Sequence, residues 1–240
     1  MPELTLLRLQ PDRIAWAQWA ARQRQPRGVL DEGFVWHGLL QAVFGTNVPK
    51  PFVDRSPAGS NELLGYVDCI KPLMDVEPLA ARAAGLAHMR TTSMPSEWRL
   101  GRILSFEVRA RPIVRSRQGD GVARTVELDA AVVARQHDVM VTREQAYRQW
   151  LAREMARGNA ADLLSMRLAA FARTRVARRQ GGEGERRWSG SSLEGPDAWF
   201  RGSLKVTDPE AFAALLARGI GRHRSFGFGC LLVAPLGVLE

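Results

Sequence analysis

The residues best suited to chemistry lie in a glycine-rich loop near the end of the chain, residues 219–229 with the sequence GIGRHRSFGFG. The loop stands between an expected helix and an apolar strand. Glycine lets a backbone approach a partner closely and adopt positive φ, and the arginine guanidinium offers a planar fork of donors that suits phosphate. A helix C-cap would require Gly219 alone. The pattern predicts contact with phosphate through Gly219, Gly221, His223, Arg224, Ser225, Gly227 and Gly229, with Arg222 beside them.

A histidine in the middle of an expected helix is the second candidate for chemistry. His37 lies within residues 31–44, and an imidazole near its ordinary pKa can carry one proton transfer near neutral pH. The alternative is a histidine at the edge of the core that is hydrogen-bonded to backbone, because no carboxylate lies three or four residues away. His88 and His137 have no partner in their segments. The chain contains no HxxxH or CxxC pattern, so the sequence predicts no metal site.

Arginine dominates the charge of the chain. Of the 34 basic residues 31 are Arg, and the formal net charge is +9. Acidic residues do not keep pace, so the excess indicates a polyanionic partner such as nucleic acid; the alternative for each single cluster is a solvated face. A first cluster is Arg22, Arg24 and Arg27. We expect RNA contact from Arg109, Arg111, Arg115 and Arg117, and from an arm with Arg173, Arg175, Arg178, Arg179, Arg186 and Arg187. For Trp188 in the arm, stacking on a base and burial are both open.

Composition sets limits on the class of protein. The 240 residues suit one large domain or two small ones, and 45% hydrophobic residues can form a proper core. Cys69 and Cys230 are too few for a metal cluster or a disulfide framework and fit small core residues, as expected for a reducing cytoplasm. The sequence shows no export segment and no apolar run of membrane-spanning length. We therefore expect a cytoplasmic protein with no membrane partner.

The expected elements alternate in the order of an α+β protein. Strands are predicted at 4–9, 63–70, 101–114, 125–133, 199–206 and 226–234, and helices at 12–24, 31–44, 74–87, 142–157, 159–179 and 209–219. Thr142 and Gln145 form a capping box, and Asp208 with Pro209 starts the last helix. This order predicts two tandem ferredoxin-like domains, residues 1–97 and 98–240, with the glycine-rich loop and a basic helical arm in the second.

The loop and its neighbours together match one family. Residues 219–229 with the following apolar strand resemble the C-terminal glycine-rich loop of the CRISPR repeat-processing endoribonucleases of the RAMP superfamily. Residues 204–212 are similar to the strand and helix that precede this loop in those proteins, and residues 101–112 are similar to their central strand. Residues 147–153 are similar to a helix of the subtype I-E members. The resemblance spans most of the chain and implies two ferredoxin-like domains that bind the CRISPR repeat hairpin.

The resemblance also implies an activity. Such proteins cut at the hairpin base without metal or cofactor: the 2′-hydroxyl attacks the adjacent phosphate and leaves a 2′,3′-cyclic phosphate. A helix histidine, often preceded by a tyrosine three residues earlier, acts as general acid or base. His37 matches it, whereas Phe34 holds the tyrosine position. Type IV members rely on arginines instead, so Arg22, Arg24 and Arg222 join His37 as catalytic candidates.

Two functions of different class stay open at this point. The first is a single-turnover endoribonuclease that keeps its product, the guide RNA, and becomes a subunit of a CRISPR effector with other subunits. The second is a non-catalytic RAMP subunit that only holds the guide RNA. The resemblance favours the endoribonuclease, and the non-catalytic subunit is the alternative.

Overall fold

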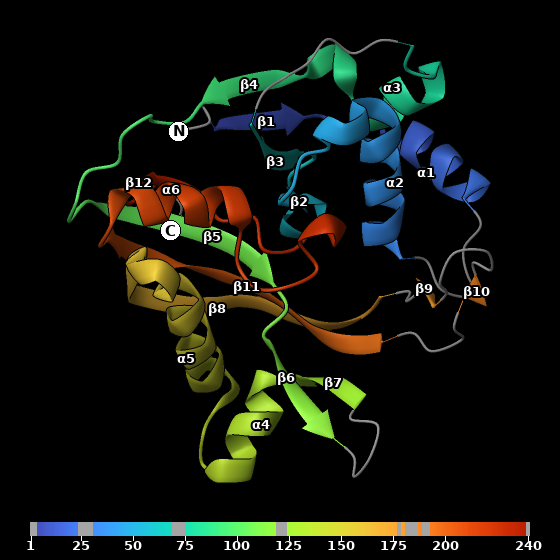
Figure 1. Cartoon of the computed structure of the whole chain (residues 1–240). Helices are drawn as coiled ribbons and strands as arrows, with labels where there is room; N and C mark the ends of the chain where they lie inside the picture. The colour runs from blue at the N-terminus through green and yellow to red at the C-terminus, as the bar shows by residue number, and fades with distance from the viewer. Residues whose placement is uncertain are drawn as a thin grey trace.

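The N-terminal half of the chain forms one antiparallel sheet covered by helices. The computed structural model describes residues 4–23, 31–68, 75–118, 124–176, 179–180, 187–188 and 193–238. In the first half the strand order is β2-β3-β1-β4, and the helices connect the strands in the pattern βαββαβ of a ferredoxin-like fold (Figure 1). Its elements are β1 (Thr5–Leu9), α1 (Arg13–Arg22), α2 (Glu32–Phe44), β2 (Phe52–Asp54), β3 (Leu63–Val67), α3 (Pro78–Ala84) and β4 (Arg90–Ser93).

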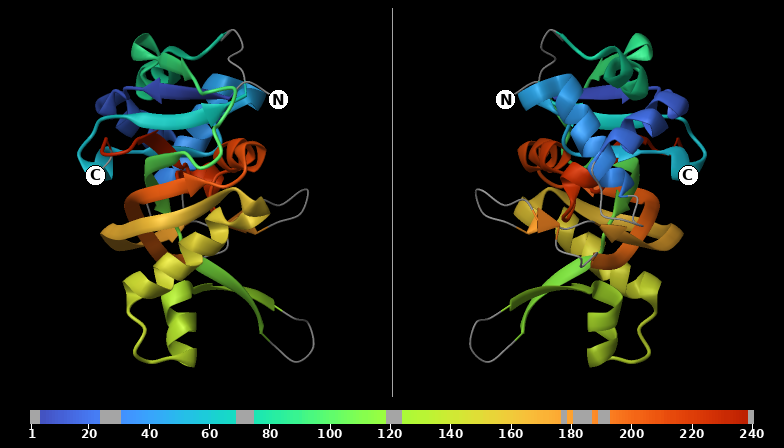
Figure 2. Two further views of the ribbon diagram at one scale, coloured as in Figure 1. Left: turned by 90° about the vertical axis from the view of Figure 1, so that its left-hand side faces the viewer. Right: turned by 90° about the vertical axis from the view of Figure 1, so that its right-hand side faces the viewer.

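The C-terminal half repeats this topology with an insertion. Its sheet has the order β12-β5-β11-β8, which is the same arrangement of first, second, third and fourth strands. A hairpin and a helix are inserted after the first strand and lie farthest from the N-terminal half (Figure 2). The elements are β5 (Ile103–Ala110), β6 (Ile113–Gln118), β7 (Arg124–Asp129), α4 (Ala130–His137), α5 (Arg143–Met155), β8 (Ala161–Val176), β9 (Arg179–Gln180), β10 (Arg187–Trp188), β11 (Leu193–Val206), α6 (Pro209–Arg218) and β12 (Leu232–Pro235).

The prediction of two ferredoxin-like units is thus confirmed, and local signals explain the helix starts. The Asp12 and Asp31 carboxylates accept hydrogen bonds from the backbone amides of the first turns of α1 and α2. Thr142 and Gln145 form the predicted capping box of α5, and Asp208 caps α6. The division of the chain at residues 97 and 98 stays a prediction.

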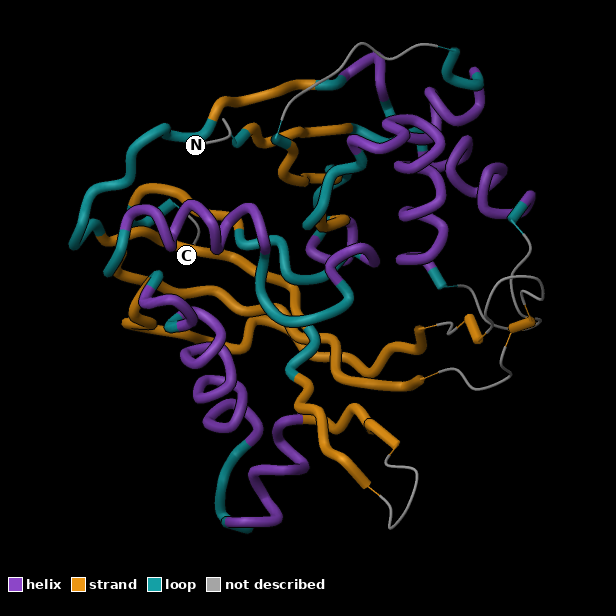
Figure 3. Tube along the Cα trace, in the orientation of Figure 1, coloured by secondary structure: helices purple, strands orange, loops and turns teal. Residues whose placement is uncertain are grey.

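The basic helical arm is the main correction to the predicted elements. Residues 159–179 were expected to be helical, but β8 occupies Ala161–Val176 and pairs along its length with β11 (Figure 3). The segment is rich in Ala, Leu and Arg, which favour helices, yet pairing with a long neighbouring strand outweighs that preference. Other elements differ as well: residues 130–137 form α4 rather than the end of a strand, and β2 and β4 lie where no strand is predicted. The predicted strand 101–114 is divided between β5 and β6, and the last strand begins at Leu232 rather than at residue 226.

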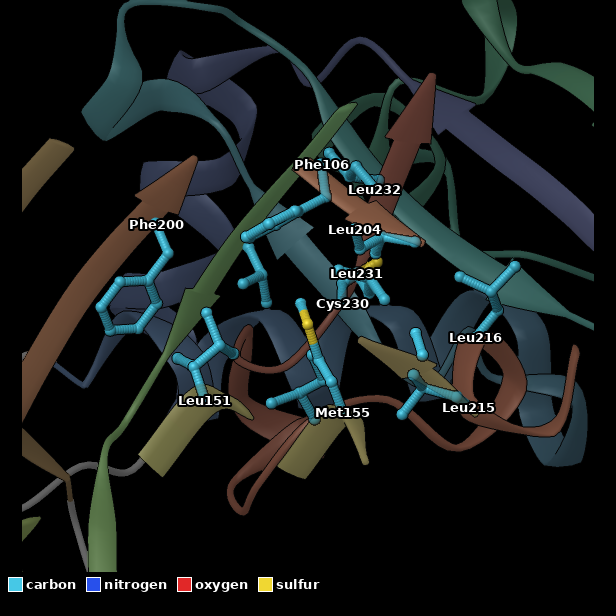
Figure 4. Close-up of a cluster of buried hydrophobic side chains, with 14 of the residues drawn as sticks. Phe106, Leu151, Met155, Phe200, Leu204, Leu215, Leu216, Cys230, Leu231 and Leu232 are labelled. Atoms are coloured by element: carbon cyan, nitrogen blue, oxygen red, sulfur yellow. The ribbon is translucent and has the colours of Figure 1, made fainter. Parts of the chain in front are cut away.

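The two halves share a hydrophobic core. The larger buried cluster combines Val53, Leu64 and Tyr66 of the first sheet with residues of the second half, some of which Figure 4 shows around Cys230. The Tyr66 hydroxyl donates a hydrogen bond of 2.8 Å to the Leu231 carbonyl. The glycine-rich loop precedes β12, so this contact helps to fix the loop between the halves.

Candidate active site

The glycine-rich loop is closed by its own backbone. The Ile220 amide donates to the Gly229 carbonyl at 2.8 Å, and the Gly229 amide donates to the Arg109 carbonyl at 2.7 Å. Gly219 and Gly229 have φ of 74° and 77°, and a Cβ at Gly229 would collide with the Ile220 carbonyl. These two glycines therefore shape the loop, and direct contact with RNA by either stays a prediction.

The other two predicted glycines of the loop differ in their surroundings. Gly221 has φ of 67°, and a Cβ there would lie 2.9 Å from the Trp150 ring, so this glycine lets the loop pack on α5. Gly227 has φ of 84°, and a Cβ would meet only the Phe52 ring at 3.5 Å. Among the four, Gly227 is the glycine whose conformation, rather than a close neighbour, excludes a side chain.

Residues 224–226 of the loop lie on one face of helix α2, which we call the seat of the loop. A Cβ at Gly33 would lie 2.5 Å from the Phe226 carbonyl oxygen, so only glycine lets residues 224–226 lie on this face of the helix. His37 follows one helical turn later on the same face. Its ring centroid is 5.6 Å from that of Phe226. Sequence reasoning identified His37 but not Gly33, although a glycine in the first turn of a helix is a signal for close packing.

The surroundings of His37 favour the neutral form of its imidazole. Its side chain is partly buried, and burial lowers the pKa of the imidazole; the positive charge of Lys50 lowers it further. A neutral imidazole can accept a proton at neutral pH. Lys50 was missed by sequence reasoning, because no local pattern ties this exposed lysine to a helix six residues before it.

His223 and Arg222 meet one carboxylate across the loop. Nε2 of His223 lies 3.1 Å from Oε2 of Glu127, and Nε of Arg222 lies 2.8 Å from Oε1 of the same group. The hydrogen bond from His223 and the charges of His223 and Arg222 hold the pKa of Glu127 at about 2, against the effect of burial. Glu127 lies on β7, so this contact joins the inserted hairpin to the loop.

The remaining catalytic candidates are not drawn to His37. Arg22 at the end of α1 pairs with Glu77 at 2.7 Å, and Arg222 pairs with Glu127 rather than with α2. Arg24 lies outside the described residues. The structure thus brings His37 together with the glycine-rich loop and leaves Arg22 paired with the segment before α3.

Two arginines predicted to contact RNA pack against the Phe228 ring of the loop: Arg111 is buried, whereas Arg109 is partly exposed and lines a cleft. Arg109 makes two hydrogen bonds with Asp197, at 2.9 and 2.6 Å, and lies over the Phe228 ring. Arg111 is 1% exposed and also lies over Phe228. Burial leaves Arg111 no surface for RNA, so the prediction of RNA contact is wrong for this residue, whose guanidinium packs on the Phe228 ring instead.

The predicted basic arm reaches the surface as a strand. Arg173 and Arg175 of β8 are exposed, and both pair with Glu194 of β11, at 2.8 and 3.8 Å. They line a cleft of about 550 Å³ together with Gly33 of α2 and Phe226 and Gly227 of the loop.

Apart from Arg109, the other arginines predicted to contact RNA lie outside this cleft or are not described. Arg115 of β6 is exposed, and the Arg224 side chain donates a hydrogen bond to the Arg218 carbonyl. The side chains of Arg117, Arg179 and Arg187 are not described, and Arg178 and Arg186 lie outside the described residues.

The described residues show neither a metal cluster nor a membrane-spanning helix. Among the described residues no cluster of three or more His, Cys, Asp or Glu side chains has the geometry of a metal site. No helix in the described ranges has the length and apolar character that crossing a bilayer requires.

Two ferredoxin-like units with a terminal glycine-rich loop define the class of protein, and comparison with known proteins gives the family. The model of the family described as CRISPR associated protein matches residues 7–235, so the chain belongs to this family. A comparison with curated protein sequences finds no match.

Solved structures share the fold across the whole chain. A structure of the CRISPR endoribonuclease Cse3 bound to a 19-nt RNA has a TM-score of 0.64 at 19% identity and covers 97% of this chain and 100% of its own. Thermus thermophilus Cse3, bound to an RNA representing a pre-cleavage complex, has a TM-score of 0.61 at 20% identity, with the same coverage. A chain of a CRISPR RNA-guided surveillance complex has a TM-score of 0.55 at 18% identity, again covering 97% and 100%.

Proposed function

We propose that this protein is an endoribonuclease that cleaves CRISPR precursor RNA at the base of the repeat hairpin. It then stays bound to the mature guide RNA as a subunit of an effector complex. The observation that carries the proposal is the contact of His37 with the glycine-rich loop through Phe226. The RNA-bound Cse3 structures and the surveillance complex that share the fold support the substrate class and the partner subunits.

The reaction needs no group beyond side chains of the protein. A base removes the proton of the 2′-hydroxyl, a bond forms between O2′ and phosphorus, and the bond from phosphorus to O5′ breaks. The products are a 2′,3′-cyclic phosphate and a 5′-hydroxyl, whose oxygen takes up a proton. Neutral His37 serves as the base, since its lowered pKa leaves it unprotonated at neutral pH. Positive charge at the loop stabilises the phosphorane.

Cleavage of repeat RNA in EDTA tests this function. Saturating wild-type protein is mixed with the repeat RNA of the CRISPR array in the source genome, and single-turnover rates are measured. His37→Ala is expected to slow cleavage by roughly 10²-fold or more, a typical general acid–base contribution, with RNA affinity nearly unchanged. His88→Ala, at the end of a short turn after α3, is the matched control.

The form of the product separates the finer parts of the proposal. The upstream fragment is expected to carry a cyclic phosphate, which blocks removal by phosphatase until acid opens the ring. A gel-shift of the reaction mixture should show the guide fragment still bound. Cleavage that disappears in EDTA, or a wild-type rate in His37→Ala, contradicts the proposed mechanism.

A second function is favoured by one residue. Phe34 stands where the resembling family often has a tyrosine, and a phenyl ring can neither donate nor accept a proton. A non-catalytic subunit that only holds guide RNA would bind the repeat hairpin with the same salt dependence and leave it intact. Tight binding without cleavage in either EDTA or Mg²⁺ selects this function.

A further inference from the structure

His223 in the glycine-rich loop is held as a proton-transfer group would be. Its Nε2 lies 3.1 Å from the Glu127 carboxylate, and its side chain is 17% exposed. Its Nδ1 has no hydrogen-bond partner among the described residues. A carboxylate on one ring nitrogen fixes the orientation of an imidazole and leaves the other nitrogen free for a substrate.

A purely structural role explains this arrangement less well. Arg222 already ties the loop to Glu127 at 2.8 Å, so the loop reaches β7 without help from its neighbour. His223 also adopts φ of 61°, a left-handed conformation that a residue with a Cβ takes at a cost. Such strain at a non-glycine residue occurs preferentially at functional sites.

The two histidines of the site both lie near one aromatic ring. The Phe226 ring centroid lies 5.6 Å from that of His37 and 6.4 Å from that of His223. The centroids of the two imidazoles are therefore no farther apart than the sum of these separations. In-line displacement at phosphorus calls for two such groups near one another, because the attacking and leaving oxygens lie on opposite sides and each needs its own proton-transfer group.

We infer that His223, oriented by Glu127, is a second catalytic residue of the cleavage reaction and protonates the leaving 5′-oxygen. The inference rests on the proposed function. His37 takes the proton of the 2′-hydroxyl as O2′ bonds to phosphorus. As the bond from phosphorus to O5′ breaks, its electron pair takes the proton of Nδ1 of His223. One imidazole gains a proton and the other loses one, so the step balances. Glu127 stays ionised throughout and acts as a positioning residue.

A modified substrate separates protonation of the leaving group from every other role. RNA with sulfur in place of the bridging 5′-oxygen releases a thiolate, which needs no proton. The cleavage position is first mapped with ordinary RNA. His223→Asn is the variant of choice, because asparagine tolerates left-handed φ better than most residues and leaves the loop conformation accessible.

We expect His223→Asn to lose cleavage activity on ordinary RNA and to recover it on RNA with the bridging sulfur. His223→Asn should slow cleavage of ordinary RNA roughly 10²-fold, a typical general-acid contribution, and cleave the sulfur RNA close to the wild-type rate. Glu127→Gln should show the same pattern with a smaller loss. His37→Ala should slow cleavage of both substrates alike. His137 is the last residue of α4, and His137→Asn should slow cleavage of neither.

Each other result overturns the inference. Equal slowing of both substrates by His223→Asn, or slowing of neither, removes His223 as the general acid; an RNA affinity measured in parallel identifies a binding role. A wild-type protein that cleaves neither substrate rejects the proposed function itself and the inference with it. The two failures are therefore distinct, because only the second appears in the unmutated protein.

Discussion

The protonation state of His37 depends on its depth in α2 and on one neighbouring charge. Burial disfavours the imidazolium, and Lys50 repels it, so both lower the pKa of His37 below its ordinary value. The charge of Lys50 is the part that a substitution can remove without opening the core. A general base must be neutral, so in the proposed mechanism Lys50 extends the pH range in which His37 can act toward acid pH.

Removing the charge of Lys50 should therefore shift the pH dependence of cleavage. In Lys50→Gln the pKa of His37 rises, a larger fraction of the imidazole is protonated below neutrality, and single-turnover cleavage at pH 6 slows. The acid limb of the rate profile moves to higher pH, while the rate at pH 8 changes little. Lys205→Gln, whose charge pairs with Asp162 on β8, is the control. An unshifted acid limb would show that Lys50 does not act on the base.

The sequence identifies candidate residues of the site more readily than the contacts between them. His37 and the glycine-rich loop stand out by residue type, since few structural roles require their combination. Glu127 does not stand out, because it is 96 residues from His223 and becomes its partner only through the fold of the inserted hairpin. Arg109 and Arg111 match the pattern of an RNA-binding strand, yet Arg109 pairs with Asp197 and Arg111 is buried.

At the scale of elements, the starts of the helices are easier to predict from the sequence than the long strand β8. Helix caps are local, so the starts of α2, α5 and α6 follow from a few neighbouring residues. Strand β8 depends on its partner β11, whose register runs over the length of both strands. A window of helix-favouring residues carries no information about that partner, which is why the arm was expected to be helical.

Two glycines of α2 offer a matched test of the loop seat. A Cβ at Gly33 would press on the Phe226 carbonyl, whereas a Cβ at Gly38 would meet nothing within 4 Å. Gly38→Ala should stabilise the protein by about 0.5–1 kcal/mol through helix propensity and retain cleavage. Gly33→Ala should lose that gain, because overpacking typically costs about 1–3 kcal/mol, and should slow cleavage by displacing Phe226 from His37.

Urea unfolding and single-turnover rates of the two variants give the answer. Equal stabilisation by both substitutions, with cleavage intact, would mean that the loop does not need its seat on the helix. Stability lost in Gly33→Ala with cleavage retained would show that the seat supports the fold alone.

On the scale of the whole molecule, the two halves are joined by charge as well as by apolar contacts. Glu107 of β5 is 1% exposed and pairs with Arg55 of the first half at 3.0 Å and with Arg201 of β11 at 2.7 Å. A buried carboxylate between two guanidinium groups is strongly destabilised when either partner is lost. The two-unit fold was predictable from the order of elements, whereas this shared interior was not, because its partners are far apart in sequence.

The net charge of +9 implies that RNA binding weakens steeply with salt. Each phosphate contact releases counterions, so the logarithm of the affinity falls linearly with the logarithm of the salt concentration. Arg173 and Arg175 line the cleft below the loop. Arg173→Gln and Arg175→Gln should each weaken repeat RNA binding at low salt and reduce the salt slope by about one.

The control is Arg157→Gln, which changes an exposed arginine near the end of α5 and should leave the slope unchanged. Filter binding between 50 and 500 mM salt, roughly the range over which phosphate contacts are screened, measures these slopes. A slope that stays the same in both β8 variants would place the RNA backbone elsewhere on the molecule.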